Sequence, residues 1–138
     1  MTERNIFITQ HDLDRLEELI AVARRTDKVD MDYLDRLDDA LVSKTSVAGR
    51  AVPEDVVTMN SRVALIDPES GQEHEYSLVF PAEANAAEGK ISVLAPLGTA
   101  LLGASRGQTV EWSAGGNLRR LRIEEILYQP EAAGDYHL

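Results

Sequence analysis

Three aspartates near residue 30 are the side chains whose type and spacing come closest to a reactive site. Asp27, Asp30 and Asp32 follow one another closely, and two carboxylates on one turn can hold Mg²⁺ while water or a substrate phosphate completes its shell. The same residue type caps helices, because its side-chain oxygens accept hydrogen bonds from free backbone N–H groups at a helix start. Helix capping is the simpler interpretation, and a metal role is the alternative.

Other reactive constellations are not supported by the residues. His11, His74 and His137 lie far apart and show no metal-ligand spacing. The glycines of segment 98–105 imitate a phosphate-binding loop, but Ala104 stands where that loop requires lysine. The chain of 138 residues contains no cysteine, which excludes disulfides and thiolate sites. We therefore expect no catalytic residues, no metal and no other cofactor.

The charge of the chain argues against nucleic acid as a direct partner. The formal net charge is −10, whereas neutralising phosphates requires a basic surplus. An acidic surface suits a basic protein partner, or simply solubility. No apolar run approaches the ~18 residues of a membrane span, and the first residues lack the pattern of a secretory signal. We expect a cytoplasmic monomer that binds neither nucleic acid nor membrane.

Two amphipathic helices are predicted for the N-terminal third of the chain, joined near residues 25–28. Apolar residues recur there at intervals of three and four, as on one face of a helix. Each arm has roughly 15 residues, or a length of about 22 Å, which places the three aspartates at the tip of a hairpin. We assign residues 1–46 to this hairpin and residues 47–56 to a linker. The apolar residues are Leu13, Leu16, Leu19, Ile20, Ala23, Leu34, Leu37 and Leu41.

Residues 57–138 are predicted to form an antiparallel β domain with one short helix, which makes the fold class α+β. Strand-like alternation of apolar residues begins at Val57 and continues to Leu65. A buried strand over 91–94 ends before Pro96, and a helical turn from 97 to 102 ends at Gly103. The last strand, 118–128, changes phase near Glu124, which predicts a β-bulge.

Several motifs in this second domain resemble the C-terminal domain of the bacterial transcript-cleavage factors GreA and GreB. The motifs are Gly89-Lys90-Ile91-Ser92, the segment from Pro96 to Gly103, and Gly107 followed by Val110. The segments 55–63 and 128–136 resemble one Gre-related branch of that family, so the resemblance covers nearly the whole chain. It implies an FKBP-like fold for residues 57–138, used as a docking module rather than as a prolyl isomerase.

The resemblance also implies a partner and a contact surface. The turn of Ala95, Pro96, Leu97 and Gly98 matches the Ser-Pro-x-Gly turn with which the Gre domain grips the rim of the RNA polymerase secondary channel. Ala95 departs from the Gre serine, which changes the hydrogen bonding at that contact. Gre factors bring a metal into the polymerase with an acidic hairpin tip. Asp27 and Asp30 imitate its Asp-x-x-Glu spacing, but Asp30 replaces the glutamate and the arms are shorter than those of Gre.

We therefore expect a non-catalytic transcription regulator that binds RNA polymerase near the secondary channel and competes with Gre-type factors. The name of the related branch implies an indirect effect on nucleoside diphosphate kinase levels. One alternative is a Gre-like cleavage or elongation factor that presents Asp27 and Asp30 with Mg²⁺. The short arms argue against it, because the tip would not reach a buried active centre. Another is an adaptor whose hairpin packs on a different protein, which an exposed apolar flank of the hairpin would favour.

Overall fold

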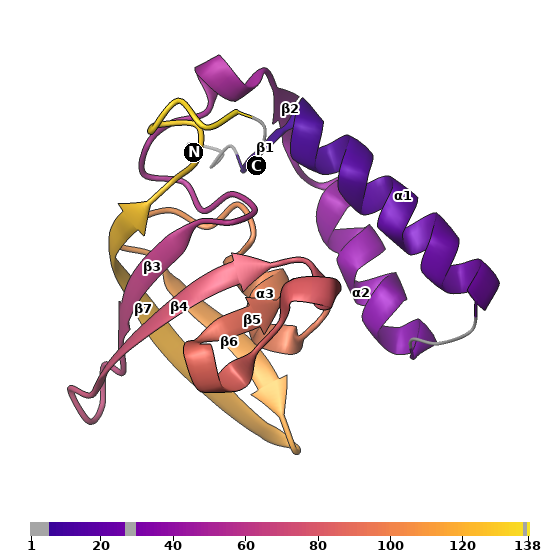
Figure 1. The fold of residues 1–138 in the computed structure, drawn as a ribbon. Helices are drawn as coiled ribbons and strands as arrows, with labels where there is room; N and C mark the ends of the chain where they lie inside the picture. Colours follow the sequence, from indigo (N-terminus) through magenta and orange to yellow (C-terminus); the bar gives the residue numbers. More distant parts are fainter. Residues whose placement is uncertain (1–5, 27–29, 137) are drawn as a thin grey trace.

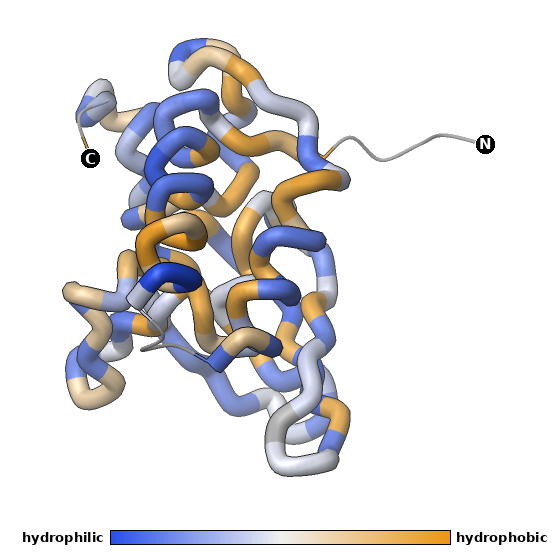
Figure 2. Tube along the Cα trace, turned by 90° about the vertical axis from the view of Figure 1, so that its right-hand side faces the viewer, coloured by the Kyte–Doolittle hydropathy of each residue, from blue (hydrophilic) through white to orange (hydrophobic). Residues whose placement is uncertain are grey.

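The computed structural model describes residues 6–26, 30–136 and 138, and it begins with the predicted helical hairpin (Figure 1). Helix α1 spans Gln10–Thr26 and helix α2 spans Met31–Val42. Thr9 caps α1, since its Oγ1 accepts a hydrogen bond of 3.0 Å from the Asp12 N–H. Hydrophobic and hydrophilic residues alternate along both helices (Figure 2). The buried stripe consists of Leu16, Ile20 and Ala23 on α1 and Leu34, Leu37 and Leu41 on α2.

The base of the hairpin is closed by a pair of short strands. Strand β1, Phe7–Thr9, precedes α1, and β2, Thr45–Val47, follows α2; the two strands pair in parallel. The sequence predicted only an apolar entry before α1, because three residues show no alternation that identifies a strand. A 3-10 helix, η1 at Gly49–Ala51, follows β2, and Val52 and Val56 are buried. The division at residues 46 and 56 stays a prediction.

The second part of the chain forms a curled sheet with strand order β5-β4-β3-β7-β6 (Figure 1). Its pairs are antiparallel except β4–β5, which is parallel. Two further 3-10 helices, η2 at Pro81–Glu83 and η3 at Ala86–Glu88, connect β4 to β5. The strands are β3 Arg62–Ile66, β4 Glu73–Val79, β5 Lys90–Ser92, β6 Thr109–Ala114 and β7 Asn117–Tyr128.

Two details of the sheet test the sequence prediction. The register between β3 and β7 shifts twice, once between Ala64 and Leu65, opposite Glu125 and Ile123, so the predicted bulge near Glu124 is confirmed. Strand β3, the first of this sheet in the sequence, begins at Arg62 and not at Val57, because the chain turns just before it. Asn60 adopts a φ of +66° in that turn, a left-handed conformation that asparagine tolerates better than most residues.

Helix α3, Pro96–Leu101, lies against the concave side of the sheet and contacts β6, β4 and β5. Leu101 and Leu102 are buried, whereas Leu97 is only half-buried. Gly103 has a φ of +81° and ends the helix as expected. One continuous core joins residues of the hairpin, the sheet and α3, so α2 lies beside α3.

The predicted fold class is therefore confirmed, as a helical hairpin followed by a curled, mainly antiparallel sheet with one short helix. Within the described residues, none of the helices is both long and apolar enough to cross a membrane.

Candidate functional site

The predicted docking turn, Ala95 to Gly98, leads from β5 into α3 and is held by local hydrogen bonds. The Ala95 N–H donates to the Ser92 carbonyl at 3.0 Å. Thr99 Oγ1 donates to the Val93 carbonyl at 2.6 Å. Pro96 occupies the first turn of α3, where its fixed φ suits a helix start. These bonds hold the turn in one conformation before any partner arrives.

The backbone at Gly98 has no room for a side chain. A Cβ atom at Gly98 would lie 2.0 Å from the Ser92 carbonyl oxygen, a distance that no side chain allows. Gly98 is itself buried, so its place in the turn is structural. Ala95, Pro96 and Leu97 are half-buried and present their outer atoms to solvent. Of the four predicted contact residues, these three are available to a partner.

Two cavities flank the turn, and Trp112 of β6 lines both of them. The first, of about 420 Å³, opens beside Leu97. The second, of about 520 Å³, opens beside Pro96 and separates α3 and β6 from α2. The turn therefore lies between two cavities that share one aromatic side chain.

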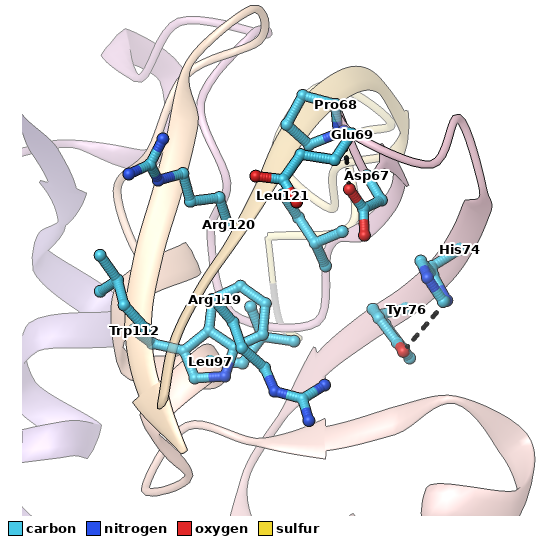
Figure 3. Close-up of a pocket in the computed structure, with 11 residues that line it drawn as sticks. Asp67, Pro68, Glu69, His74, Tyr76, Leu97, Trp112, Arg119, Arg120 and Leu121 are labelled. Atoms are coloured by element: carbon cyan, nitrogen blue, oxygen red, sulfur yellow. Dashed lines mark hydrogen bonds between the residues drawn. The ribbon is translucent and has the colours of Figure 1, made fainter. Parts of the chain in front are cut away.

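The first cavity joins the end of the β6–β7 hairpin to the β3–β4 turn (Figure 3). Leu97, Trp112 and Arg119 lie on one side of it and the Asp67–Glu69 turn on the other. Hydrogen bonds from the backbone N–H groups of Glu69 and Ser70 lower the pKa of Asp67. Asp67 thus stabilises its own turn, as an aspartate at the first turn position commonly does.

The histidine in this cavity is engaged by an aromatic neighbour. The rings of His74 and Tyr76 are stacked with centroids 5.7 Å apart, and the Tyr76 hydroxyl lies 3.4 Å from His74 Nδ1. Among the described residues, no three His, Cys, Asp or Glu side chains gather in a way that could hold a metal ion. His11 is exposed on α1, and His137 lies outside the described residues. The cavity is suited to contact with apolar and charged side chains.

The hairpin tip is described only in part. Asp30 caps α2, because its Oδ1 accepts a hydrogen bond of 2.9 Å from the Asp32 N–H. Asp32 is exposed in the first turn of α2, where a negative charge is favourable. Asp27 lies outside the described residues. The capping interpretation therefore holds for Asp30, and a contact of the tip with a partner stays a prediction.

A buried polar cluster connects the hairpin to the second part of the chain, and the sequence analysis missed it. Asp12, on α1, is 0% exposed. Its carboxylate accepts hydrogen bonds from Arg15 Nη2 at 2.7 Å and from the Met59 N–H at 3.0 Å. Burial raises the pKa of Asp12, although Arg15 and the Met59 N–H act in the opposite direction. We call this cluster the junction. It consists of Asp12, Arg15, Thr58, Met59, Gln129 and Glu131.

The tail after β7 completes the junction. The Thr58 hydroxyl donates to Glu131 Oε1 at 2.6 Å. Gln129 Nε2 donates to the carbonyl oxygens of Pro53 and Val56, both at 2.7 Å. Burial, and to a smaller extent the nearby Asp12 charge, raises the pKa of Glu131. The tail therefore packs on the domain and is not a free extension.

The position of Asp12 on its helix is a sequence signal for the junction. Asp12 lies four residues before Leu16, which places it on the same face as Leu16 and Ile20. A carboxylate on a buried stripe must find a hydrogen-bonding partner, because an unpaired buried charge is very costly. That partner was unpredictable, since Met59 is far away in the sequence.

Comparisons with known proteins match from about half of the chain to all of it. Residues 52–128 match the family model described as "Transcription elongation factor, GreA/GreB, C-term". The chain is 35% identical to the "Regulator of nucleoside diphosphate kinase" of Escherichia coli K12, with all of both chains covered. It is 30% identical over 97 residues to the elongation factor GreA of Syntrophus aciditrophicus, which covers 70% of this chain and 60% of that protein.

A solved structure shows the same relationship. The transcription elongation factor GreA/GreB from Nitrosomonas europaea superposes with a TM-score of 0.74 at 36% identity. The superposition covers 90% of this chain and 100% of that chain. The likeness predicted from the sequence motifs is thus confirmed.

Proposed function

The chain belongs to the GreA/GreB family of transcription elongation factors, and from this premise we propose that it regulates transcription by binding RNA polymerase near the secondary channel. It acts there without catalysing a reaction and competes with Gre-type factors for the same rim. Any effect on nucleoside diphosphate kinase levels follows indirectly from transcription.

The observation that carries this proposal is the construction of the turn at Pro96. Hydrogen bonds at Ala95 and Thr99 and the close packing of Gly98 hold the turn in one conformation. Three of its residues remain partly accessible. A surface that is already ordered loses little conformational entropy when a partner binds. A docking turn needs both properties.

The size of the hairpin supports a regulator rather than a cleavage factor. Helix α1 has 17 residues and α2 has 12, or lengths of about 26 and 18 Å at 1.5 Å per residue. Asp30 is occupied as a helix cap. The hairpin therefore shadows the channel entrance and does not deliver a metal to a distant active centre.

A binding titration tests the proposal. Fluorescently labelled protein is titrated with core RNA polymerase, with unlabelled GreA or GreB as competitor. Saturable binding that Gre displaces, and that Pro96→Asn weakens at least tenfold, is the expected result. Pro81→Asn is the matched control, because Pro81 also begins a short helix, η2. No binding of the wild type at micromolar concentrations would refute the proposal.

The alternative cleavage role has a separate readout. Asp32→Asn and Asp30→Ser remove carboxylates from the described part of the tip, and serine keeps a side chain that can cap α2. We expect neither change to alter transcript cleavage in stalled elongation complexes, with or without Mg²⁺. A stimulation of cleavage by the wild type that these changes abolish would favour the alternative.

A further inference from the structure

We propose that the groove between α2 and β6 is the second half of the docking surface, and that it receives a polymerase segment bearing a basic side chain beside an apolar one. This inference rests on the proposed function and specifies its contact. It adds the body of the hairpin, and not only the turn at Pro96, to the surface that the partner touches.

The groove has a shape that suits one apolar side chain. Its volume is about 520 Å³, and small or flat side chains line it: Ala40 of α2, Pro96 and Ala100 of α3, and Trp112 of β6. None of these four residues is fully buried. Figure 1 shows α2 running beside α3. An aliphatic side chain can therefore enter between the helices and cover the indole and proline rings.

The rim of the groove has more carboxylates than cationic groups. Asp39 of α2 and Glu111 of β6 both line it, with one guanidinium, that of Arg36. Glu111 pairs with Arg120 at 3.2 Å, and the Arg36 guanidinium lies 5.6 Å from the Tyr33 ring. Within the described part of the chain, Asp39 forms no ion pair. Asp39 is thus the carboxylate most available to a lysine or arginine of a partner.

Two other acidic residues of α2 are less available to a partner than Asp39. They are partly neutralised, since Arg24 pairs with Asp35 at 3.0 Å and with Asp38 at 3.4 Å. The chain as a whole carries a net charge of −10, which attracts a basic partner from a distance. Complementary charge at the rim then sets the orientation of the bound segment.

The groove is continuous with the proposed docking turn and is held open by the fold. Pro96 belongs to both, so a partner seated on the turn lies at the groove entrance. The position of α2 is fixed through the hairpin core and through the contact of Asp12 with the Met59 N–H. The two walls therefore keep their spacing without a partner, which lowers the cost of ordering them.

Three variants test the groove in the same titration with core RNA polymerase. Asp39→Lys reverses the free rim charge at an exposed position and should weaken binding at least tenfold at low salt, with a smaller effect at high salt. Ala40→Phe fills the groove and should weaken binding at both salt concentrations. Glu18→Lys makes the same charge change on the exposed side of α1 and should change the Kd by less than about threefold, because long-range steering alone is affected.

The outcomes separate the two proposals. If Pro96→Asn weakens binding while Asp39→Lys and Ala40→Phe bind like the wild type, the groove is not a contact and the docking function stands. If the wild type does not bind, the proposed function fails and the groove proposal fails with it. Circular dichroism confirms the fold of each variant, and Asp39→Lys alone decides the question if Ala40→Phe does not fold.

Discussion

Replacing Arg15 with alanine tests whether a buried ion pair fixes the hairpin to the β domain. Arg15 Nη2 lies 2.7 Å from Asp12 Oδ1, and the Asp12 side chain is fully buried. The same guanidinium also donates to the Leu138 carbonyl oxygen at 2.7 Å. Arg15→Ala leaves the Asp12 carboxylate with the Met59 N–H as its remaining donor. The cost is therefore that of a buried charge that has lost its counter-ion.

The magnitude follows from the geometry. Removing one partner of a buried ion pair costs about 3–5 kcal/mol, but the Arg15 side chain is 31% exposed. Water can enter the vacated space, so the low end applies. The guanidinium also lies 4.6 Å from the Phe80 ring centroid, a cation–π contact of about 0.5–1 kcal/mol. We expect a loss of about 3–4 kcal/mol in the free energy of unfolding, or a Tm lower by roughly 10–15 °C.

Urea and thermal unfolding, followed by circular dichroism at pH 7, measure this loss. Arg24→Ala is the control on the same helix, because the ion pairs that Arg24 forms among the described residues are with exposed aspartates, and it should cost less than about 1 kcal/mol. Part of the Arg15→Ala loss should be recovered at pH 5, because the uncompensated Asp12 carboxyl can then take up a proton. A loss as small as that of Arg24→Ala would show that the pair does not hold the hairpin in place.

Three further predictions concern single contacts. Gly98→Ala should lower the free energy of unfolding in urea by more than about 3 kcal/mol. Overpacking typically costs about 1–3 kcal/mol, and here the obstructing group is the Ser92 backbone carbonyl, which cannot move aside. A smaller loss of stability would mean that the turn can relax. The pKa of Glu131 is raised above its usual 4.5, so its contribution to stability is complete below pH 4.5 and is lost as the pH rises through the folded-state pKa. Glu131→Gln should flatten this part of the stability–pH curve, and an unchanged curve would contradict the assignment. The hydrogen bond of Tyr128 to Asp135 at 2.5 Å raises the pKa of Tyr128 to about 12. Asp135→Asn should therefore lower the pKa of Tyr128 in an ultraviolet titration. An unchanged titration would show that the Asp135 carboxylate does not raise this pKa.

Local patterns in the sequence predicted the elements whose formation depends on neighbouring residues. The apolar stripes of the hairpin, the helix end at Gly103 and the bulge near Glu124 each have a signal within a few residues. The turn at Pro96 was located for the same reason. In contrast, the need for glycine at Gly98 arises from the close approach of the Ser92 carbonyl, where β5 ends, and residue spacing alone could not reveal that distance.

The features that were missed depend on contacts between distant segments. Strands β1 and β2 are three residues each and pair across the whole hairpin. The junction brings Asp12 to Met59 and Thr58 to Glu131. The groove beside Pro96 exists because α2 packs against α3. A sequence pattern gives each of these partners separately, but only the folded chain brings them together.

The parallel pair at the base of the hairpin holds the two ends of the arm together. Phe7 lies opposite Thr45, so the chain enters and leaves the arm at neighbouring points. Seven residues added to each arm at the tip would continue the same apolar seam and leave the β domain and the turn at Pro96 unchanged. Arm length can therefore change at the tip while the turn at Pro96 and the groove residues of α2 keep their places, and such variants would share one attachment surface but differ in reach.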